Sequence, residues 1–251
     1  MCPQCQRPAA VGVQCVDCVA EAAAATRQSR TIFGGTLRQG RPVVTMGIIA
    51  ACALMYVLQL TVPGWTARWS FSPLRDQGDY VRMISSGFIH FSIPHIALNM
   101  ITLWFVGPIL ERAFGRVRYL VLYLVCAFGG SVGVVVLAGP THSWAVQVGG
   151  ASGAIFGLFG ALLMVLRRTG ADVRGIVTLI VLNLVLGFVV RGIAWQAHLG
   201  GLVTGLVLAA AYAYVPRGWQ KVAAWAAPVV VVALLVVAMQ LAYQTAPTVL
   251  G

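Results

Sequence analysis

The chain has 251 residues, of which 59% are hydrophobic and only 9% are charged. Soluble domains are roughly half apolar and about a quarter charged, so this depletion of charge excludes a disordered chain and argues against a soluble globule. Uncharged stretches of about 20 residues recur from Val43 onward, and each is long enough to cross a hydrocarbon core of about 30 Å as a helix. The sequence therefore predicts an all-α, multi-pass membrane protein.

Seven apolar segments follow one another along the chain. Their ranges are 43–62, 94–110, 119–137, 146–166, 175–190, 193–215 and 222–241. Pro94 suits the first turn of the second segment, where the missing backbone N–H is not needed. We divide the chain into a cysteine-containing segment (1–24), a basic linker (25–42), a six-helix core (43–215), and a further linker with a seventh helix (216–251).

Basic residues predict the orientation in the membrane. The formal net charge is +11, which positively charged cytoplasmic flanks explain without a nucleic-acid partner. With the N-terminus inside, 13 of the 17 Lys and Arg residues lie on the cytoplasmic side. The start of the chain is hydrophilic and does not resemble a cleavable signal peptide. We expect a cell-membrane protein with a cytoplasmic N-terminus and an outer C-terminus.

The loop at 63–93 is long and rich in aromatic residues, which favour the membrane–water boundary. We expect it to lie partly in the outer leaflet. Its aromatic residues are Trp65, Trp69, Phe71, Tyr80, Phe88 and Phe91.

Strongly polar side chains are rare within the apolar segments, so each one suggests function. His95 and Asn99 share a face of the second segment, Ser152 lies in the glycine-rich start of the fourth, and His198 lies in the sixth. All three segments run inward from the outer face. At about 1.5 Å per residue, Asn99, Ser152 and His198 each lie about 8–9 Å below that face. The sequence therefore predicts one polar layer near the outer surface.

A serine beside a histidine is the minimum for nucleophilic hydrolysis, because the imidazole removes the hydroxyl proton. None of the six acidic residues lies in this layer, and Glu111 is at the opposite face, so the expected unit is a dyad rather than a triad. Asn99, His95 and the backbone N–H of Ser152 can donate hydrogen bonds to the oxyanion of a tetrahedral intermediate.

Three blocks in this order resemble the rhomboid family of intramembrane serine proteases over residues 43–215. They are HFSIPHIALNM at 90–100, GASG at 150–153 followed by Phe156, and Ala197-His198 with Gly201 and Gly205. The resemblance implies that Ser152 is the nucleophile, that His198 is the base, and that His95 and Asn99 stabilise the oxyanion.

The resemblance also implies that Phe156 packs against the catalytic histidine, with Gly150, Gly153 and Gly201 as close-packing positions around the site. Family members cut single-pass membrane proteins near the outer end of the substrate helix and need no cofactor for catalysis. The chain departs from the family in two places. Tyr80-Val81-Arg82 stands where the family often has Trp-Arg, and a seventh helix occurs only in some members.

Other interpretations stay open. Ser152 taken alone would be a helix-packing residue, because small residues four apart permit close helix contact. A non-proteolytic rhomboid-like protein that binds membrane clients is the alternative function. The residue at 154 is Ala and no strand precedes Ser152, which does not fit the Gly-x-Ser-x-Gly elbow of soluble hydrolases. Transport sites usually lie near the midplane, whereas this layer is off-centre and lacks carboxylates.

Four of the six cysteines lie in the first 18 residues, as two C-x-x-C pairs. Four thiolates at such spacing can bind one tetrahedral Zn²⁺, and disulfides do not persist in the cytoplasm. We expect a small zinc knuckle that depends on the metal for folding. A redox pair, including a redox-sensor function, and an iron–sulfur site are the alternatives. The four ligands would be Cys2, Cys5, Cys15 and Cys18.

Overall fold

A computed structural model describes residues 5–8, 11–25, 31, 33, 40–141, 143–190, 192–244 and 246. The chain divides into two compact units, Met1–Arg30 and Thr31–Gly251. In the first unit, strands β1 (Gln6–Pro8) and β2 (Val13–Cys15) pair antiparallel and are followed by helix α1 (Val16–Ala25). This arrangement is a short hairpin with a helix attached to its second strand.

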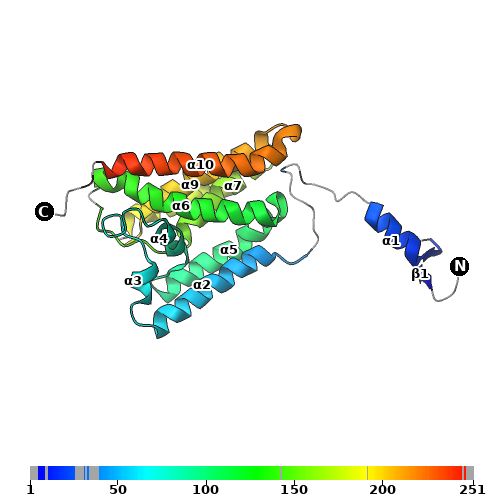
Figure 1. Ribbon diagram of the computed structural model, residues 1–251, viewed down its shortest axis with the longest axis horizontal. Helices are drawn as coiled ribbons and strands as arrows, with labels where there is room; N and C mark the ends of the chain where they lie inside the picture. Colours follow the sequence, from blue (N-terminus) through cyan, green and yellow to red (C-terminus); the bar gives the residue numbers. More distant parts are fainter. Residues whose placement is uncertain are drawn as a thin grey trace. The chain divides into compact units, whose positions relative to one another are not determined.

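The second unit is a helical bundle (Figure 1). Its long helices are α2 (Val43–Thr61), α5 (Ile93–Phe114), α6 (Arg116–Thr141), α7 (Ser152–Thr169), α9 (Trp195–Tyr214) and α10 (Gln220–Tyr243). Its shorter elements are α3 (Trp65–Trp69), α4 (Tyr80–Ser85), η2 (Ser86–Phe88), α8 (Arg174–Val189) and η3 (Arg217–Trp219). Helix α7 packs most extensively against α9, and both pack against α6.

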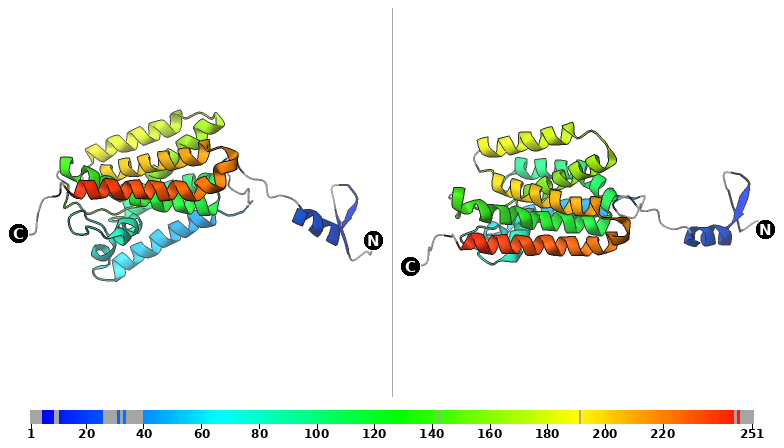
Figure 2. Two further views of the ribbon diagram at one scale, coloured as in Figure 1. Left: turned by 45° about the horizontal axis from the view of Figure 1, so that its top comes forward. Right: turned by 90° about the horizontal axis from the view of Figure 1, so that it is seen from above.

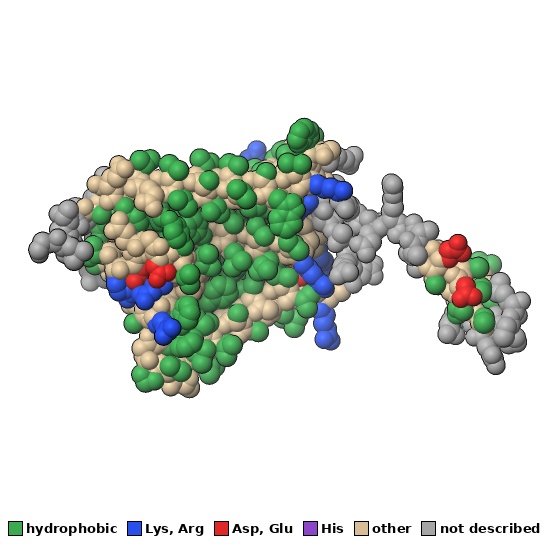
Figure 3. All heavy atoms as spheres, in the orientation of Figure 1, with side chains coloured by type: hydrophobic (Ala, Val, Ile, Leu, Met, Phe, Trp, Pro, Cys, Tyr) green, Lys and Arg blue, Asp and Glu red, His purple; other side chains and the backbone are tan. Residues whose placement is uncertain are grey.

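The six long helices of the described chain are long and apolar enough to cross a membrane. Figure 3 shows hydrophobic side chains over the flank of the bundle, with Lys and Arg gathered towards its two ends. Large apolar side chains such as Leu54, Phe105 and Leu234 are more than half exposed on α2, α5 and α10. Because such a surface needs lipid as its solvent, the chain is a multi-pass membrane protein.

The predicted segments all correspond to helices, with two differences. The fifth segment forms α8, which has 16 residues and at about 24 Å is shorter than the hydrocarbon core. Figure 2 shows α8 at the edge of the bundle. Only Ile176, Ile180 and Gly187 of α8 are buried, so this helix is held by few packed side chains.

The predicted start of the fourth helix at Val146 is wrong, because α7 begins at Ser152. Residues 146–150 are not helical, and Val148 forms a β-bridge with Phe71 instead of a helical turn. Gly150 has φ +134°, a backbone conformation outside the helical region that glycine tolerates. The helical rise that placed Ser152 below the outer face therefore does not apply to this segment.

Glycines bring the backbones of α7 and α9 into direct contact. A Cβ atom added to Gly201 would overlap the carbonyl oxygen of Gly153, and one added to Gly205 would overlap that of Gly157. Small residues at such spacing allow membrane helices to approach at backbone distance. The start of α7 and the start of α9 are held side by side for this reason.

The loop between α2 and α5 is ordered around one buried carboxylate. Asp76 accepts hydrogen bonds from the backbone N–H of Ser72 and from the side chains of Arg75 and Arg82. Burial raises the pKa of Asp76, but these hydrogen bonds and the two positive charges outweigh burial and lower its pKa below the usual value. Arg82, the partial match to the family motif, thus binds within the loop.

Substituting Gly205 by Ala tests the backbone contact. The new Cβ would collide with the Gly157 carbonyl, so we expect Gly205→Ala to lower the free energy of unfolding by about 1–3 kcal/mol. Gly47→Ala is the matched control, because no atom lies within 4 Å of a Cβ at that position in α2. Thermal unfolding of both variants in one detergent measures the difference. Equal midpoints for the two variants would contradict the contact.

Candidate functional site

Ser152 and His198 come together at the starts of two neighbouring helices. Ser152 is the first residue of α7, and His198 lies in the first turn of α9. The His198 Nε2 atom and the Ser152 Oγ atom are 2.9 Å apart, within hydrogen-bond distance. An imidazole at this distance can accept the hydroxyl proton, so the pair has the geometry of an activated nucleophile.

An aromatic ring, rather than a carboxylate, orients His198. The Phe156 ring lies parallel to the imidazole, with centroids 4.1 Å apart and planes inclined by 10°. The buried Nδ1 of His198 has no hydrogen-bond partner among the described residues. Glu111 is twelve residues beyond Asn99 on α5, where it accepts hydrogen bonds from the backbone N–H groups of Val44 and Thr45. That carboxylate caps the start of α2 instead.

His95 and Asn99 line the same cavity as Ser152 and His198, and its volume is about 490 Å³. The His95 ring lies against Gly150, where an added Cβ would be 2.7 Å from the imidazole Nε2. Asn99 donates one hydrogen bond from Nδ2 to the His95 carbonyl at 2.8 Å, which leaves a second N–H on that amide. All four polar residues predicted from the sequence therefore meet in one place.

His90 is a site residue to which the sequence argument gave no role. Its side chain is fully buried, and its Nε2 accepts a hydrogen bond from the backbone N–H of Ala151 at 3.4 Å. Gln59 of α2 holds the backbone of His90 through both amide atoms. Burial and the neighbouring His95 lower the pKa of His90 to about 4. The sequence shows that His90 lies five residues before His95, but only the tertiary structure shows its contact with Ala151.

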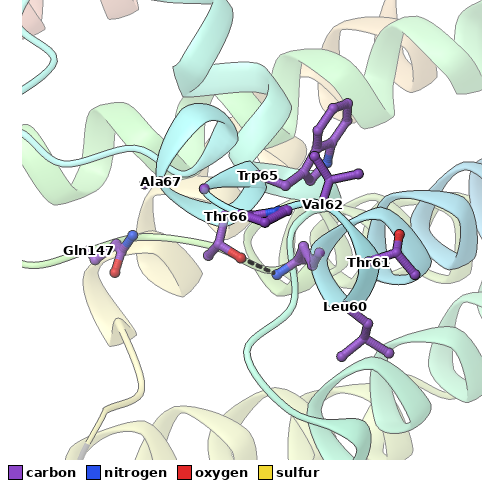
Figure 4. A pocket seen from close by; sticks show the side chains of 10 residues that line it. Leu60, Thr61, Val62, Trp65, Thr66, Ala67 and Gln147 are labelled. Carbon is purple, nitrogen blue, oxygen red and sulfur yellow. Dashed lines mark hydrogen bonds between the residues drawn. The ribbon is translucent and has the colours of Figure 1, made fainter.

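A second cavity of about 460 Å³ lies where the end of α2 meets α3 (Figure 4). Within it the Gln59 amide donates to the Thr66 hydroxyl at 3.1 Å. Gln147 lines both cavities and donates to the Ser70 hydroxyl at 2.7 Å. The polar residues beside the cavity of Ser152 and His198 thus continue into the loop between α2 and α5.

The cysteines of the N-terminal unit are free thiols at Cys5, Cys15 and Cys18, and Cys2 lies outside the described residues. Strand β1 begins directly after Cys5, and its first residue pairs with Cys15, so these two cysteines lie at one end of the hairpin. Within the described part of the chain, no three His, Cys, Asp or Glu side chains converge as a metal site.

The described chain is thus a helical membrane protein in which a serine and a histidine share one cavity. Residues 77–215 match the family model described as "Rhomboid domain". The chain is 34% identical over 199 residues to "Rhomboid protease GluP" of Bacillus subtilis (strain 168), covering 73% of this chain and 38% of that protein. It is 31% identical over 184 residues to "Rhomboid protease GlpG" of Serratia proteamaculans (strain 568), covering 69% and 64%.

The chain therefore belongs to the rhomboid family. A plant relative, "RHOMBOID-like protein 4" of Arabidopsis thaliana, is 36% identical over 134 residues, which are 51% of this chain and 32% of that protein. The chain spans less than two thirds of the length of each of these relatives.

Acidification tests the neutral state of His90. A protonated Nε2 could no longer accept the Ala151 hydrogen bond, and the folded pKa of about 4 lies below the ordinary value of 6.5. The unfolded chain then binds the proton more tightly, so the free energy of unfolding should fall as the pH drops from about 6.5 to 4. Denaturant titrations across this range measure the slope.

His90→Gln is the matching variant, because an amide can accept the same hydrogen bond without titrating. We expect its stability to depend less steeply on pH over the same interval than that of the unsubstituted chain. Superimposable pH profiles would show that His90 does not contribute.

Proposed function

We propose that this chain is an intramembrane serine endopeptidase that cleaves transmembrane proteins near the outer face of the membrane. The observation that carries the proposal is the 2.9 Å separation of Ser152 Oγ and His198 Nε2 within a cavity between membrane helices. The rhomboid proteases among the relatives support the same reaction. A client-binding protein without catalysis would have no need for a paired serine and histidine.

In the first step, Ser152 Oγ attacks the carbonyl carbon of the scissile peptide bond while His198 Nε2 takes the hydroxyl proton. The carbonyl oxygen becomes an oxyanion, which His95, the Asn99 amide and the backbone N–H of Ser152 stabilise. The first N–H groups of a helix have no acceptor within that helix, so the N–H of Ser152 is suited to this role. Collapse of the intermediate breaks the C–N bond, and His198 gives its proton to the departing amine.

The second step returns the enzyme to its starting state. A water molecule attacks the ester carbonyl of the acyl-enzyme, and His198 takes a proton from that water. The C–O bond to Ser152 then breaks, the serine oxygen recovers the proton, and the new carboxylic acid leaves. Phe156 keeps the imidazole plane fixed through both steps, since its ring stacks on that of His198 with centroids 4.1 Å apart.

The substrate helix must enter from the lipid, and α8 is the element suited to move. Its Asn183 and the following Val190 line the active cavity, while few of its residues are buried. Displacement of α8 or of the outer loop at 63–93 would open the cavity sideways. Water would enter from the outer side, where irregular backbone at 146–151 lines the cavity instead of facing lipid.

In this orientation the N-terminus is cytoplasmic and the C-terminus is outside. Arg112, Arg116, Arg167 and Arg168 lie in the last turn of α5, the start of α6 and the last turn of α7, which would be the cytoplasmic ends. Because the excess of positive charge marks the cytoplasmic side, the site then opens to the outer face. With α8 crossing the membrane as the seventh span, the two termini lie on opposite sides.

Labelling with a fluorophosphonate tests the nucleophile. We expect the unsubstituted chain to be labelled, and Ser152→Ala to lose both labelling and cleavage of a single-pass substrate by about 10³-fold or more. Ser143→Ala is the control, because this serine does not line the active cavity. Equal labelling of the wild type and Ser152→Ala would refute the assignment. Substrate binding without any product would favour the client-binding alternative.

The N-terminal cysteines are proposed to bind one Zn²⁺. Gln6 pairs with Cys15 in the hairpin, so Cys5 lies next to this pair, and Cys18 lies in the first turn of α1. Cys2 precedes Cys5 at the C-x-x-C spacing. Two such pairs at the end of a hairpin and the start of a helix can supply four thiolates. Because about 25 residues cannot form a core, the metal would supply the folding energy of this unit.

Metal content of the full-length protein tests this site. We expect about one zinc per chain by elemental analysis, lost in Cys5→Ser, since one missing thiolate breaks the tetrahedral set. Cys126→Ala is the control, because Cys126 is buried in the helical bundle. Zinc retained at one per chain in Cys5→Ser would contradict the site, and a reversible disulfide in its place would indicate the redox alternative.

A further inference from the structure

The last two turns of α10 contact the outer loop. Met239 is fully buried, and Tyr243 is only 8% exposed although it is the last residue of the helix. The Gln240 amide lies 3.5 Å from the Tyr80 hydroxyl of α4. Figure 1 shows this end of α10 at the same end of the bundle as α3. The seventh predicted segment therefore joins the part of the molecule that surrounds the active cavity.

Tyr243 connects two segments that are distant in sequence. Its hydroxyl donates a hydrogen bond to the Pro73 carbonyl at 3.1 Å, and this bond is buried. Its ring packs against that of Trp144, with centroids 5.8 Å apart and planes inclined by 36°. One side chain thus holds both the α2–α5 loop and the segment that precedes α7.

These two segments form a short irregular ribbon. Phe71 and Val148 exchange two backbone hydrogen bonds, of 3.1 and 2.7 Å, and the Leu74 N–H donates to the Trp144 carbonyl at 2.9 Å. Val148 is followed directly by the glycines that lead to Ser152. The position of the ribbon therefore decides where the chain enters α7.

These residues belong to a larger apolar cluster, of which Val148 and Ala197 also line the cavity. The cluster contains Phe71, Met83, Trp144, Val148, Ala197, Met239 and Tyr243. Ala197 directly precedes His198, so packing from α10 reaches the neighbours of both members of the dyad. Close-packed interiors transmit small displacements because their side chains have little free space.

We propose that the end of α10 is a brace for the catalytic serine, with Tyr243 as a positioning residue that acts through the 71–74 and 144–148 ribbon. This role rests on the proposed protease function. Tyr243 touches neither Ser152 nor His198 among the contacts of the described residues, and it lies at the opposite end of the ribbon from the nucleophile.

Tyr243→Phe removes only the hydroxyl and keeps the ring against Trp144. We expect hydrogen–deuterium exchange to become faster at the ribbon N–H groups of Phe71, Leu74 and Val148, and not in α2. Inactivation by a fluorophosphonate and kcat should each fall about three- to tenfold, the value of one hydrogen bond, with KM unchanged. A purely structural role would lower the unfolding temperature and speed exchange throughout the bundle without this separation of kcat from KM.

Tyr214→Phe is the matched control, because Tyr214 is 56% exposed and is the last residue of α9, at the end of the helix opposite to His198. It should leave both exchange and inactivation as in the wild type. Unchanged exchange at the ribbon in Tyr243→Phe, or faster exchange with unchanged inactivation, would overturn the proposal. If the wild type itself is not labelled, the proposed function fails, whereas the exchange measurement still decides whether Tyr243 holds the ribbon.

Discussion

The contact between the bare backbones of α7 and α9 is the constraint on which the rest of the site depends. Gly201 faces the carbonyl of Gly153 so closely that no side chain fits between them. Ser152 and His198 lie on these two helices beside that contact, and their 2.9 Å separation is possible only at such a helix distance. Van der Waals packing between small residues, which holds membrane helices together without a hydrophobic effect, thereby sets the distance between the hydroxyl and the imidazole.

The site is built from neutral groups, which suits its surroundings. A buried carboxylate beside His198 would need several hydrogen bonds to offset its desolvation. Stacking of Phe156 orients the imidazole without bringing in charge. His90 is kept neutral by burial and uses its ring nitrogen to accept a backbone hydrogen bond. In the loop between α2 and α5, Arg75 and Arg82 pair with Asp76, and none of the three lines the cavity.

The irregular segment before α7 explains how Ser152 comes to lie at a helix start within a membrane protein. Its backbone groups are satisfied by Phe71, by the Ser86 carbonyl that accepts from Gly150, and by His90. Such non-helical backbone is tolerated in a membrane protein where it lines a cavity and is bonded to protein. The loop between α2 and α5 therefore contributes to the site, and the end of α10 contacts that loop.

The sequence by itself determined the seven apolar helices and the family, because apolar length and three local blocks are written within single segments. It also predicted that Ser152, His198, His95 and Asn99 lie near one another, and the four line one cavity, although the predicted depth of Ser152 assumed a helix at 146–151. Tertiary structure alone decided that this segment is not helical, because its hydrogen bonds go to Phe71 and Ser86, more than 60 residues away. The partners of His90 and Tyr243 were hidden for the same reason. Periodicity reports which face of an element is apolar, whereas long-range hydrogen bonds depend on where distant elements meet.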